Sequence, residues 1–221
     1  MRKNPLVAGE IYHIFTRSIA DFKILNKAGD FERMKHLIMY YLVKNDIKFS
    51  NFIGLKIVRK EGFNNALELF SKGKEGLVQI ISYCLMPTHI HLALKQLAKS
   101  GIHKYMKDIL NSYTRYFNIK HKRKGPLWES RFKSVLVDSD EQLLHLTRYI
   151  HLNPSTAKLV EKPEDWKFSS YGEYLSRENN IISFCQFDDI LDIKPATYRK
   201  FVNDQISYQR ELAKIKNLKI D

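Results

Sequence analysis

Residues 77–95 read LVQIISYCLMPTHIHLALK, and this stretch decides the fold. Two apolar runs, 77–85 and 89–95, flank Met86-Pro87-Thr88, a pattern that predicts two strands joined at these three residues. Proline has no backbone N–H to donate to a ladder, which places Pro87 in the turn or at a strand start. Because side chains alternate across a strand, His89 and His91 are expected on one face of the second strand.

Working outward, alternating and helical spacings predict an α+β fold, with a sheet packed on one face by helices. The other predicted strands are 10–17, 47–59 (followed by a turn at EGFNN) and 131–137. The predicted helices are 29–44 behind an Asp30 cap, about 98–120, about 139–152 and a terminal helix at about 196–217. Asp138 or Ser139 caps the third helix, Glu141 is placed to complete a capping box, and Asn153-Pro154 is expected to end it. We expect a core domain over 1–160 and a mainly helical extension over 161–221.

The composition of the 221-residue chain is that of a globular protein, with 44% hydrophobic and 28% charged residues. Extensive disorder is therefore excluded. No apolar run approaches the roughly 18 residues of a membrane span, and the N-terminal sequence lacks the apolar region of a signal peptide. The only two cysteines, Cys84 and Cys185, form no CxxC motif. We therefore expect a cytoplasmic protein without disulfides.

Positive charge is the first indication of a partner. Lys and Arg number 37 against 24 acidic residues, a formal net charge of +13. Between Lys95 and Lys133 the chain carries eleven basic residues and two acidic ones. Clustering of this strength favours a nucleic acid over a membrane surface, since no basic amphipathic anchor is evident. The alternative is a solvated surface without a partner.

Two patterns carry candidate chemistry. The pair His89 and His91 could hold one divalent cation through neutral imidazoles, or could be two incidental surface histidines. In the stretch RYIHLNP (148–154), Tyr149 and Asn153 are four residues apart and so share a helix face. Position on a helix does not by itself distinguish a catalytic tyrosine from one that fills a core or an interface.

Four blocks of the sequence resemble one enzyme family. SYCLMPTHIHLALK (82–95) resembles the CLMPNHxHLL block of the HUH single-tyrosine transposases, the insertion-sequence-200-like group. GEIYHIFTRS, SYTRYFN…GPLWESRFKS and DEQLLHLTRYIHLNP are similar to blocks of the REP-associated tyrosine transposase branch. The blocks follow in the family order over about residues 8–160. Thr88 departs from the family, in which asparagine is common at that position, and the C-terminal segment lies outside the resemblance.

The resemblance implies an RRM- or ferredoxin-like antiparallel sheet, with the histidines on a central strand and the tyrosine on an adjacent helix. It implies His89, His91 and Asn153 as ligands of Mg²⁺ or Mn²⁺ and Tyr149 as the nucleophile. The implied reaction is cleavage and transfer of single-stranded DNA at hairpins through a 5′-phosphotyrosine, by a monomer or a homodimer. The alternatives are a hairpin DNA- or RNA-binding protein that does not cut, and a metal-dependent phosphodiesterase that uses water.

Further residues are candidates for supporting roles. The expected DNA contacts are Arg17, Arg115, Lys122, Arg123, Lys124, Arg131 and Lys133. His145 is either a proton acceptor for Tyr149 or a solvent-facing histidine. Tyr113 and Tyr116 are either rival nucleophiles or packing and base-stacking residues, and Trp128 either stacks on a base or is buried. His13 is a further candidate for the site.

Overall fold

The computed structural model describes residues 5–176 and 184–218. Four antiparallel strands form one sheet in the order β2-β3-β1-β4. The strands are β1 (Ile11–Arg17), β2 (Val78–Leu85), β3 (His89–Gln96) and β4 (Lys133–Val137). The predicted strands 10–17, 77–85, 89–95 and 131–137 are thus present, and the predicted α+β, ferredoxin-like class is confirmed.

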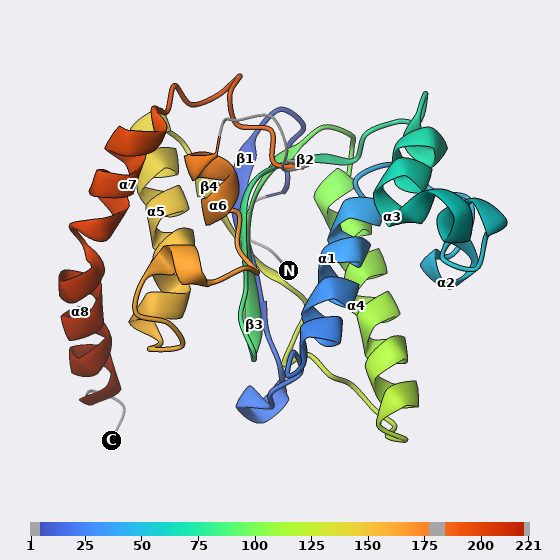
Figure 1. The fold of residues 1–221 in the computed structure, drawn as a ribbon, viewed down its shortest axis with the longest axis horizontal. Helices are drawn as coiled ribbons and strands as arrows, with labels where there is room; N and C mark the ends of the chain where they lie inside the picture. The colour runs from blue at the N-terminus through green and yellow to red at the C-terminus, as the bar shows by residue number, and fades with distance from the viewer. Residues whose placement is uncertain (1–4, 177–183, 219–221) are drawn as a thin grey trace.

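Helices cover both faces of the sheet, so the expectation of a single covered face is wrong (Figure 1). α1 and α4 lie on one side, α5 and α6 lie on the other, and α7 and α8 pack against α5. The bounds are α1 (Ala28–Tyr40), α4 (Gly101–Lys120), α5 (Asp140–Thr156), α6 (Tyr171–Leu175), α7 (Pro195–Asn203) and α8 (Ile206–Leu218). All eight residues of β2 are buried, as expected of a strand enclosed on both faces. The predicted terminal helix at 196–217 is interrupted between α7 and α8.

The predicted strand over 47–59 is wrong, because this region forms α2 (Phe49–Phe52) and the start of α3 (Lys56–Ser71). Its aromatic residues pack on α1, with the Tyr40 ring centroid 5.3 Å from Phe49 and 4.9 Å from Phe52. These contacts override the local strand preference of a β-branched, aromatic sequence. The turn expected at EGFNN does not separate two elements. This segment lies inside α3, which is interrupted at Gly62, where φ is 79°.

α5 begins at the predicted cap but runs past its predicted end. The Ser139 hydroxyl accepts a hydrogen bond from the Gln142 backbone N–H, and Gln142, not Glu141, reaches back to the Asp138 N–H. Pro154 lies inside the helix and cannot donate to the Ile150 carbonyl. The Asn153 side-chain amide lies 3.5 Å from this carbonyl and 2.9 Å from that of Tyr149. The helix therefore continues, and Asn153 is held against it.

The C-terminal segment completes the sheet. Residues 168–170 pair with the outer edge of β2: Leu85 N–H donates to the Phe168 carbonyl at 2.9 Å and Ser170 N–H to the Tyr83 carbonyl at 3.0 Å. Farther along the same edge, Gln186 N–H donates to Ile80 at 2.8 Å. Covering an exposed strand edge prevents pairing with other chains. The predicted helical extension is confirmed, and a domain boundary at residue 160 stays a prediction.

Within the described ranges, the helices include none with the length and apolarity to cross a membrane. Cys84 and Cys185 are both buried. The two short 3₁₀ helices are Ile19–Asp21 and Pro163–Asp165.

Gly101→Ala is expected to destabilise the fold, because α4 starts directly against the backbone that leads into β2. A Cβ at Gly101 would lie 2.1 Å from the Leu77 carbonyl oxygen, so the helix must move. We expect a loss of about 2 kcal/mol in the free energy of unfolding, measured by urea denaturation. Gly172→Ala in α6 is the matched control, since its Cβ would meet nothing within 4 Å. Equal stabilities of the two variants would contradict this close packing.

Candidate active site

The two histidines of the H-x-H motif lie at the start of β3, in the interior of the sheet. Strand pairing sets His91 opposite Phe15 of β1 and Cys84 of β2, and sets His89 opposite Arg17. His91 is buried, with 7% of its surface exposed, and His89 is half-buried. Their side chains occupy the face on which α5 packs, since both line one cleft with Tyr149.

Each imidazole is oriented through one ring nitrogen. Nδ1 of His89 lies 2.9 Å from the Thr88 hydroxyl, and Nδ1 of His91 lies 3.0 Å from Nε2 of His13. Nε2 of His89 and of His91 are therefore the nitrogens left to bind a ligand. Hydrogen bonds of this kind fix the tautomer and the ring direction of metal-binding histidines. Thr88, the departure from the family pattern, thus contributes a hydrogen bond beside the motif.

Burial keeps these rings neutral. It lowers the pKa of His13 to about 4 and, together with the charge of Arg17, that of His89 to about 4. Burial also holds the pKa of His91 well below its usual value, and the neighbouring His89, His13 and Arg17 act in the same direction. A neutral imidazole is the form that can act as a ligand, and burial keeps these rings in that form at neutral pH.

The Tyr149 side chain of α5 lies beside the rings of His13 and His91. Its ring centroid lies 5.6 Å from that of His91 and 5.9 Å from that of His13, edge-on to both. The ring is 43% exposed, so a substrate can reach it. Partial burial raises the pKa of the Tyr149 phenol, a rise that the Asn153 side chain and the charge of Arg17 oppose. The phenol is therefore protonated at neutral pH and needs help to act as a nucleophile.

Asn153 lies one turn beyond Tyr149 on the same helix and lines the same cleft. Its Nδ2 donates to the Tyr149 carbonyl, which leaves Oδ1 as its free ligand atom. The cleft has a volume of about 430 Å³. It is lined by His89, His91, Tyr149 and Asn153, together with Phe15, Thr16, Arg17, Glu129, Ser130, Arg131 and Lys133. The predicted nucleophile and ligand residues are thus brought together around one cleft.

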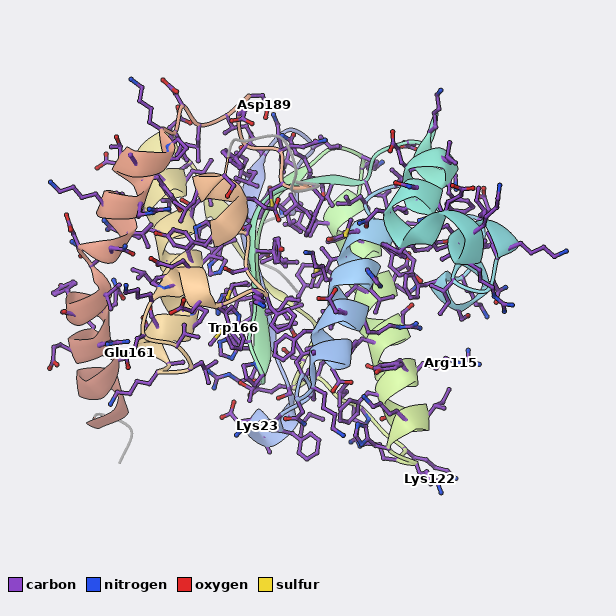
Figure 2. The ribbon with its side chains drawn as sticks, in the orientation of Figure 1. Lys23, Arg115, Lys122, Glu161, Trp166 and Asp189 are labelled. Atoms are coloured by element: carbon purple, nitrogen blue, oxygen red, sulfur yellow. The ribbon has the colours of Figure 1, made fainter. Side chains whose placement is uncertain are left out.

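The expected DNA-binding residues fall into two groups. Arg17 on β1, Arg131 just before β4 and Lys133 on β4 line the cleft. The remaining four lie elsewhere: Figure 2 shows Arg115 on the side of α4 away from the sheet and Lys122 beyond the end of that helix. Arg123 donates to the Asn118 side chain and to the Pro126 carbonyl, and Lys124 follows it in the same loop.

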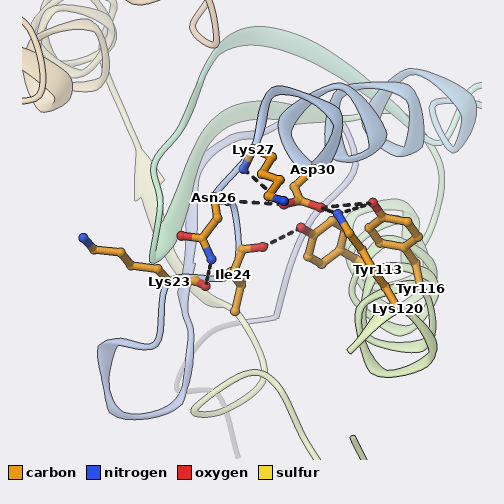
Figure 3. A network of polar contacts seen from close by, with 8 residues as sticks. All are labelled: Lys23, Ile24, Asn26, Lys27, Asp30, Tyr113, Tyr116 and Lys120. Atoms are coloured by element: carbon orange, nitrogen blue, oxygen red, sulfur yellow. Dashed lines mark hydrogen bonds and ion pairs between the residues drawn. The ribbon is translucent and has the colours of Figure 1, made fainter. Parts of the chain in front are cut away.

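The alternative tyrosines have structural partners. The Tyr113 hydroxyl donates to the Ile24 carbonyl at 2.7 Å, and that of Tyr116 donates to Asp30 at 3.0 Å (Figure 3). Lys120 pairs with the same buried carboxylate at 2.5 Å. Together they tie α4 to α1 and the segment before it. Both tyrosines belong to α4, which covers the face of the sheet opposite α5 (Figure 1).

His145 has partners other than Tyr149. Its Nδ1 lies 2.9 Å from an Arg148 nitrogen, and its ring packs edge-on against Phe201 of α7. Trp128 is half-buried, and its indole N–H donates to the Thr114 hydroxyl at 3.1 Å.

The sequence left the role of His13 open and did not point to Glu129 or Ser130. His13 was one candidate among several, and only strand pairing places it against His91. The alternation of β1 was the available signal, because His13 and Phe15 share a face just as His89 and His91 do. Glu129 and Ser130 carry no local pattern and reach the cleft through the course of the loop before β4.

Comparisons with known proteins agree with this geometry. Residues 57–153 match the family described as IS200-like transposases, and this range holds both motif histidines, Tyr149 and Asn153. The fold and this partial match are similar to those of the single-tyrosine transposases. More particularly, the chain is a relative of the REP-associated tyrosine transposases, and the resemblance drawn from its sequence is confirmed.

One curated protein and one solved structure are similar to this chain. A Haemophilus influenzae protein named as a REP-associated tyrosine transposase is 31% identical over 104 residues, which cover 42% of this chain and 58% of that protein. The match thus spans little more than half the length of that relative. The solved structure of a REP-associated tyrosine transposase bound to a REP hairpin aligns with a TM-score of 0.51. It covers 88% of this chain and 95% of that chain at 15% identity, a likeness that establishes the fold.

Acid is expected to destabilise the protein through the histidine cluster. His13 and His89 stay neutral in the fold down to a pKa of about 4, whereas an unfolded histidine takes up a proton near pH 6.5. The unfolded chain therefore binds more protons between pH 6.5 and 4, and stability falls by up to about 1.4 kcal/mol per pH unit for each ring. Urea denaturation across this range without divalent metal measures the slope. His13→Gln should make it shallower, and an unchanged slope would contradict the assignment.

Proposed function

We propose that this protein cleaves and rejoins single-stranded DNA through Tyr149. The observation that supports this most strongly is the Tyr149 ring beside His91, in a cleft that also holds His89 and Asn153. Three basic residues, Arg17, Arg131 and Lys133, line the same cleft and suit a phosphate backbone. The proposed substrate is single-stranded DNA at a hairpin, by analogy with the structure solved on a REP hairpin.

In the proposed reaction, the Tyr149 oxygen attacks a backbone phosphorus and loses its proton. The bond from phosphorus to the 3′ oxygen breaks, and the leaving 3′ oxygen takes up a proton. The products are a 5′-phosphotyrosine and a free 3′-OH. The number of phosphate ester bonds is unchanged, so a 3′-OH can reverse the step and join strands without ATP.

The donor set of the cleft fits a divalent cation. Nε2 of His89, Nε2 of His91 and Oδ1 of Asn153 remain free after their orienting hydrogen bonds, and both rings are neutral. We propose that these atoms would hold Mg²⁺ or Mn²⁺. Two imidazoles with an amide oxygen suit Mn²⁺ somewhat better by ligand type. Such an ion polarises a phosphate oxygen and offsets charge in the transition state.

The residues of the chain supply positioning and charge. Arg17 lies at the end of β1 opposite His89, and its charge partly opposes the rise that burial causes in the pKa of the Tyr149 phenol. The ion pair of Arg17 with Asp21 is exposed at both ends and is therefore weak, so a phosphate can replace it. α5 fixes Tyr149 and Asn153 one turn apart, which holds the nucleophile and the amide in one orientation.

Tyr149→Phe is expected to abolish a covalent adduct between the protein and a hairpin oligonucleotide. The substitution removes the attacking oxygen and leaves the ring packing in place, so hairpin affinity should change by less than about twofold. Denaturing gel electrophoresis with a labelled oligonucleotide and Mn²⁺ detects the adduct, and fluorescence anisotropy measures binding. Tyr208→Phe, at an exposed tyrosine of α8, is the control. An adduct that persists in Tyr149→Phe would reject the nucleophile.

Two other outcomes define the alternative functions. Binding of hairpins without an adduct under any metal condition would indicate a binding protein derived from a transposase. Metal-dependent cleavage that survives Tyr149→Phe would indicate a phosphodiesterase that uses water. A cytoplasmic location, and a monomeric or homodimeric state, stay predictions.

His13 is expected to support metal binding by accepting a hydrogen bond from His91 Nδ1, which directs His91 Nε2 toward the cleft. His13→Leu should weaken Mn²⁺ binding about 10- to 100-fold, measured by electron paramagnetic resonance of free Mn²⁺. His13→Gln retains an acceptor oxygen and should recover part of the affinity. Equal affinity of wild type and His13→Leu would exclude this positioning role.

A further inference from the structure

His151 is a fully buried polar side chain of α5 that the reaction described above does not use. It lies between Tyr149 and Asn153 in the sequence, two residues from each. Successive residues turn by about 100° around a helix, so a separation of two places His151 on the side of α5 opposite both of them. The imidazole is therefore directed away from the catalytic cleft.

The buried ring joins α5 to the C-terminal segment. Nδ1 of His151 lies 2.7 Å from the Tyr198 hydroxyl of α7, and Nε2 lies 2.8 Å from the hydroxyl of Ser170, just before α6. The Tyr198 hydroxyl donates to the Thr147 hydroxyl of α5 at 2.9 Å. The Tyr83 backbone N–H of β2 donates to the Ser170 oxygen at 2.9 Å. These contacts link α5 to the edge of the sheet and to α7.

Only one direction of proton donation satisfies every group in this network. Thr147 donates its hydroxyl proton to the Leu144 carbonyl at 2.8 Å, so its oxygen accepts from Tyr198. The Tyr198 oxygen has then used its own proton and accepts one from Nδ1–H of His151. Burial lowers the pKa of His151 to about 3, so the ring is neutral and its Nε2 accepts from Ser170. Donation therefore runs from the start of α6 through His151 to α5.

This network sets the rotation of α5. A buried network whose groups are all satisfied rigidifies the structure around it, and loss of one partner leaves a buried polar group unpaired. Thr147 and His151 are four residues apart, so they lie on one side of α5 in successive turns. The helix is thus held at two points along its length. Its rotation determines the place of Tyr149, whose ring centroid lies 5.6 Å from that of His91.

We propose that His151 is a positioning residue, which holds α5 through Tyr198 so that the Tyr149 oxygen is aimed at the reacting phosphorus. The inference rests on the proposed function, because it takes Tyr149 as the nucleophile. The family model matches residues 57–153, so Ser170 and Tyr198 lie beyond the matched range. The C-terminal segment thus supports catalysis without entering the cleft. A displacement of about 1 Å at a reacting group can lower a rate on the order of 100-fold.

The first test compares Tyr198→Phe with Tyr174→Phe. Each substitution removes one buried hydroxyl, and that of Tyr174 donates to the Ile81 carbonyl of β2 at 2.8 Å rather than to α5. Urea denaturation should therefore show similar losses of stability. At saturating hairpin and Mn²⁺, Tyr198→Phe should slow adduct formation about tenfold and change hairpin affinity by less than about twofold. Tyr174→Phe should match wild type in both, and equal rates for the two variants would overturn the positioning role.

A double-mutant cycle separates this role from general stabilisation. Thr147→Val keeps the shape of the side chain and removes the acceptor of the Tyr198 hydroxyl. If the network acts as one unit, Thr147→Val combined with Tyr198→Phe should slow adduct formation no more than the slower single variant does. Losses that multiply would show independent effects and would overturn the network.

A measurement without DNA or metal tests the direction of donation. ¹⁵N NMR of protein labelled at histidine distinguishes an Nδ1–H imidazole from an Nε2–H imidazole, and His151→Gln identifies the signal of His151 by its loss. We expect the proton on Nδ1. A proton on Nε2 would reverse the donation to Ser170, leave the Tyr198 hydroxyl with two acceptors for one proton, and overturn the inference.

Failure of the inference can be told from failure of the proposed function. If wild type forms an adduct at Tyr149 and Tyr198→Phe forms it as fast as Tyr174→Phe, the positioning role is rejected and the catalytic proposal stands. If wild type forms no adduct with any hairpin although His151 carries its proton on Nδ1, the proposed function is rejected and the network has a structural role alone.

Discussion

The antiparallel pairing of β1 with β3 is the constraint on which the site depends. It joins strands separated by more than seventy residues of sequence and sets Phe15 opposite His91 and Arg17 opposite His89. The same register brings His13 within 3.0 Å of His91. A slip of one residue would turn the motif histidines to the opposite face of the sheet. The pairing of these two strands thus sets the directions of the histidine rings and the position of Arg17. It also determines which face of the sheet carries His89 and His91.

The enclosure of the sheet by helices gives the cleft its electrostatic character. α5 lies over the histidine face, and the C-terminal segment seals the β2 edge, so the imidazoles are withdrawn from water. Burial is the largest cause of their lowered pKa values and of the raised pKa of Tyr149. Neutral imidazoles and a protonated phenol follow from one desolvated environment. This combination suits metal-assisted nucleophilic chemistry, in which a cation offsets the charge that the phenol must develop.

The loop before β4 lies between the catalytic cleft and α4. Ser130 and Arg131 stand between that cleft and a second cavity along α4, while Trp128 is anchored to that helix. The segment thus turns around the edge of the sheet and presents different residues to each cavity.

The sequence by itself determined four strands, the α+β class, the H-x-H face and the start of α5 at Ser139, because these rest on local alternation and capping. The order of four family-like blocks also pointed to Tyr149 and Asn153 as candidates for the site, and their roles stay predictions. The features that depend on contacts between distant residues were visible only in the tertiary structure. Aromatic packing on α1 made 47–59 helical, and the Asn153 amide allowed α5 to continue through Pro154. Pairing between distant strands placed His13 beside His91, and no local spacing encodes a contact across 78 residues.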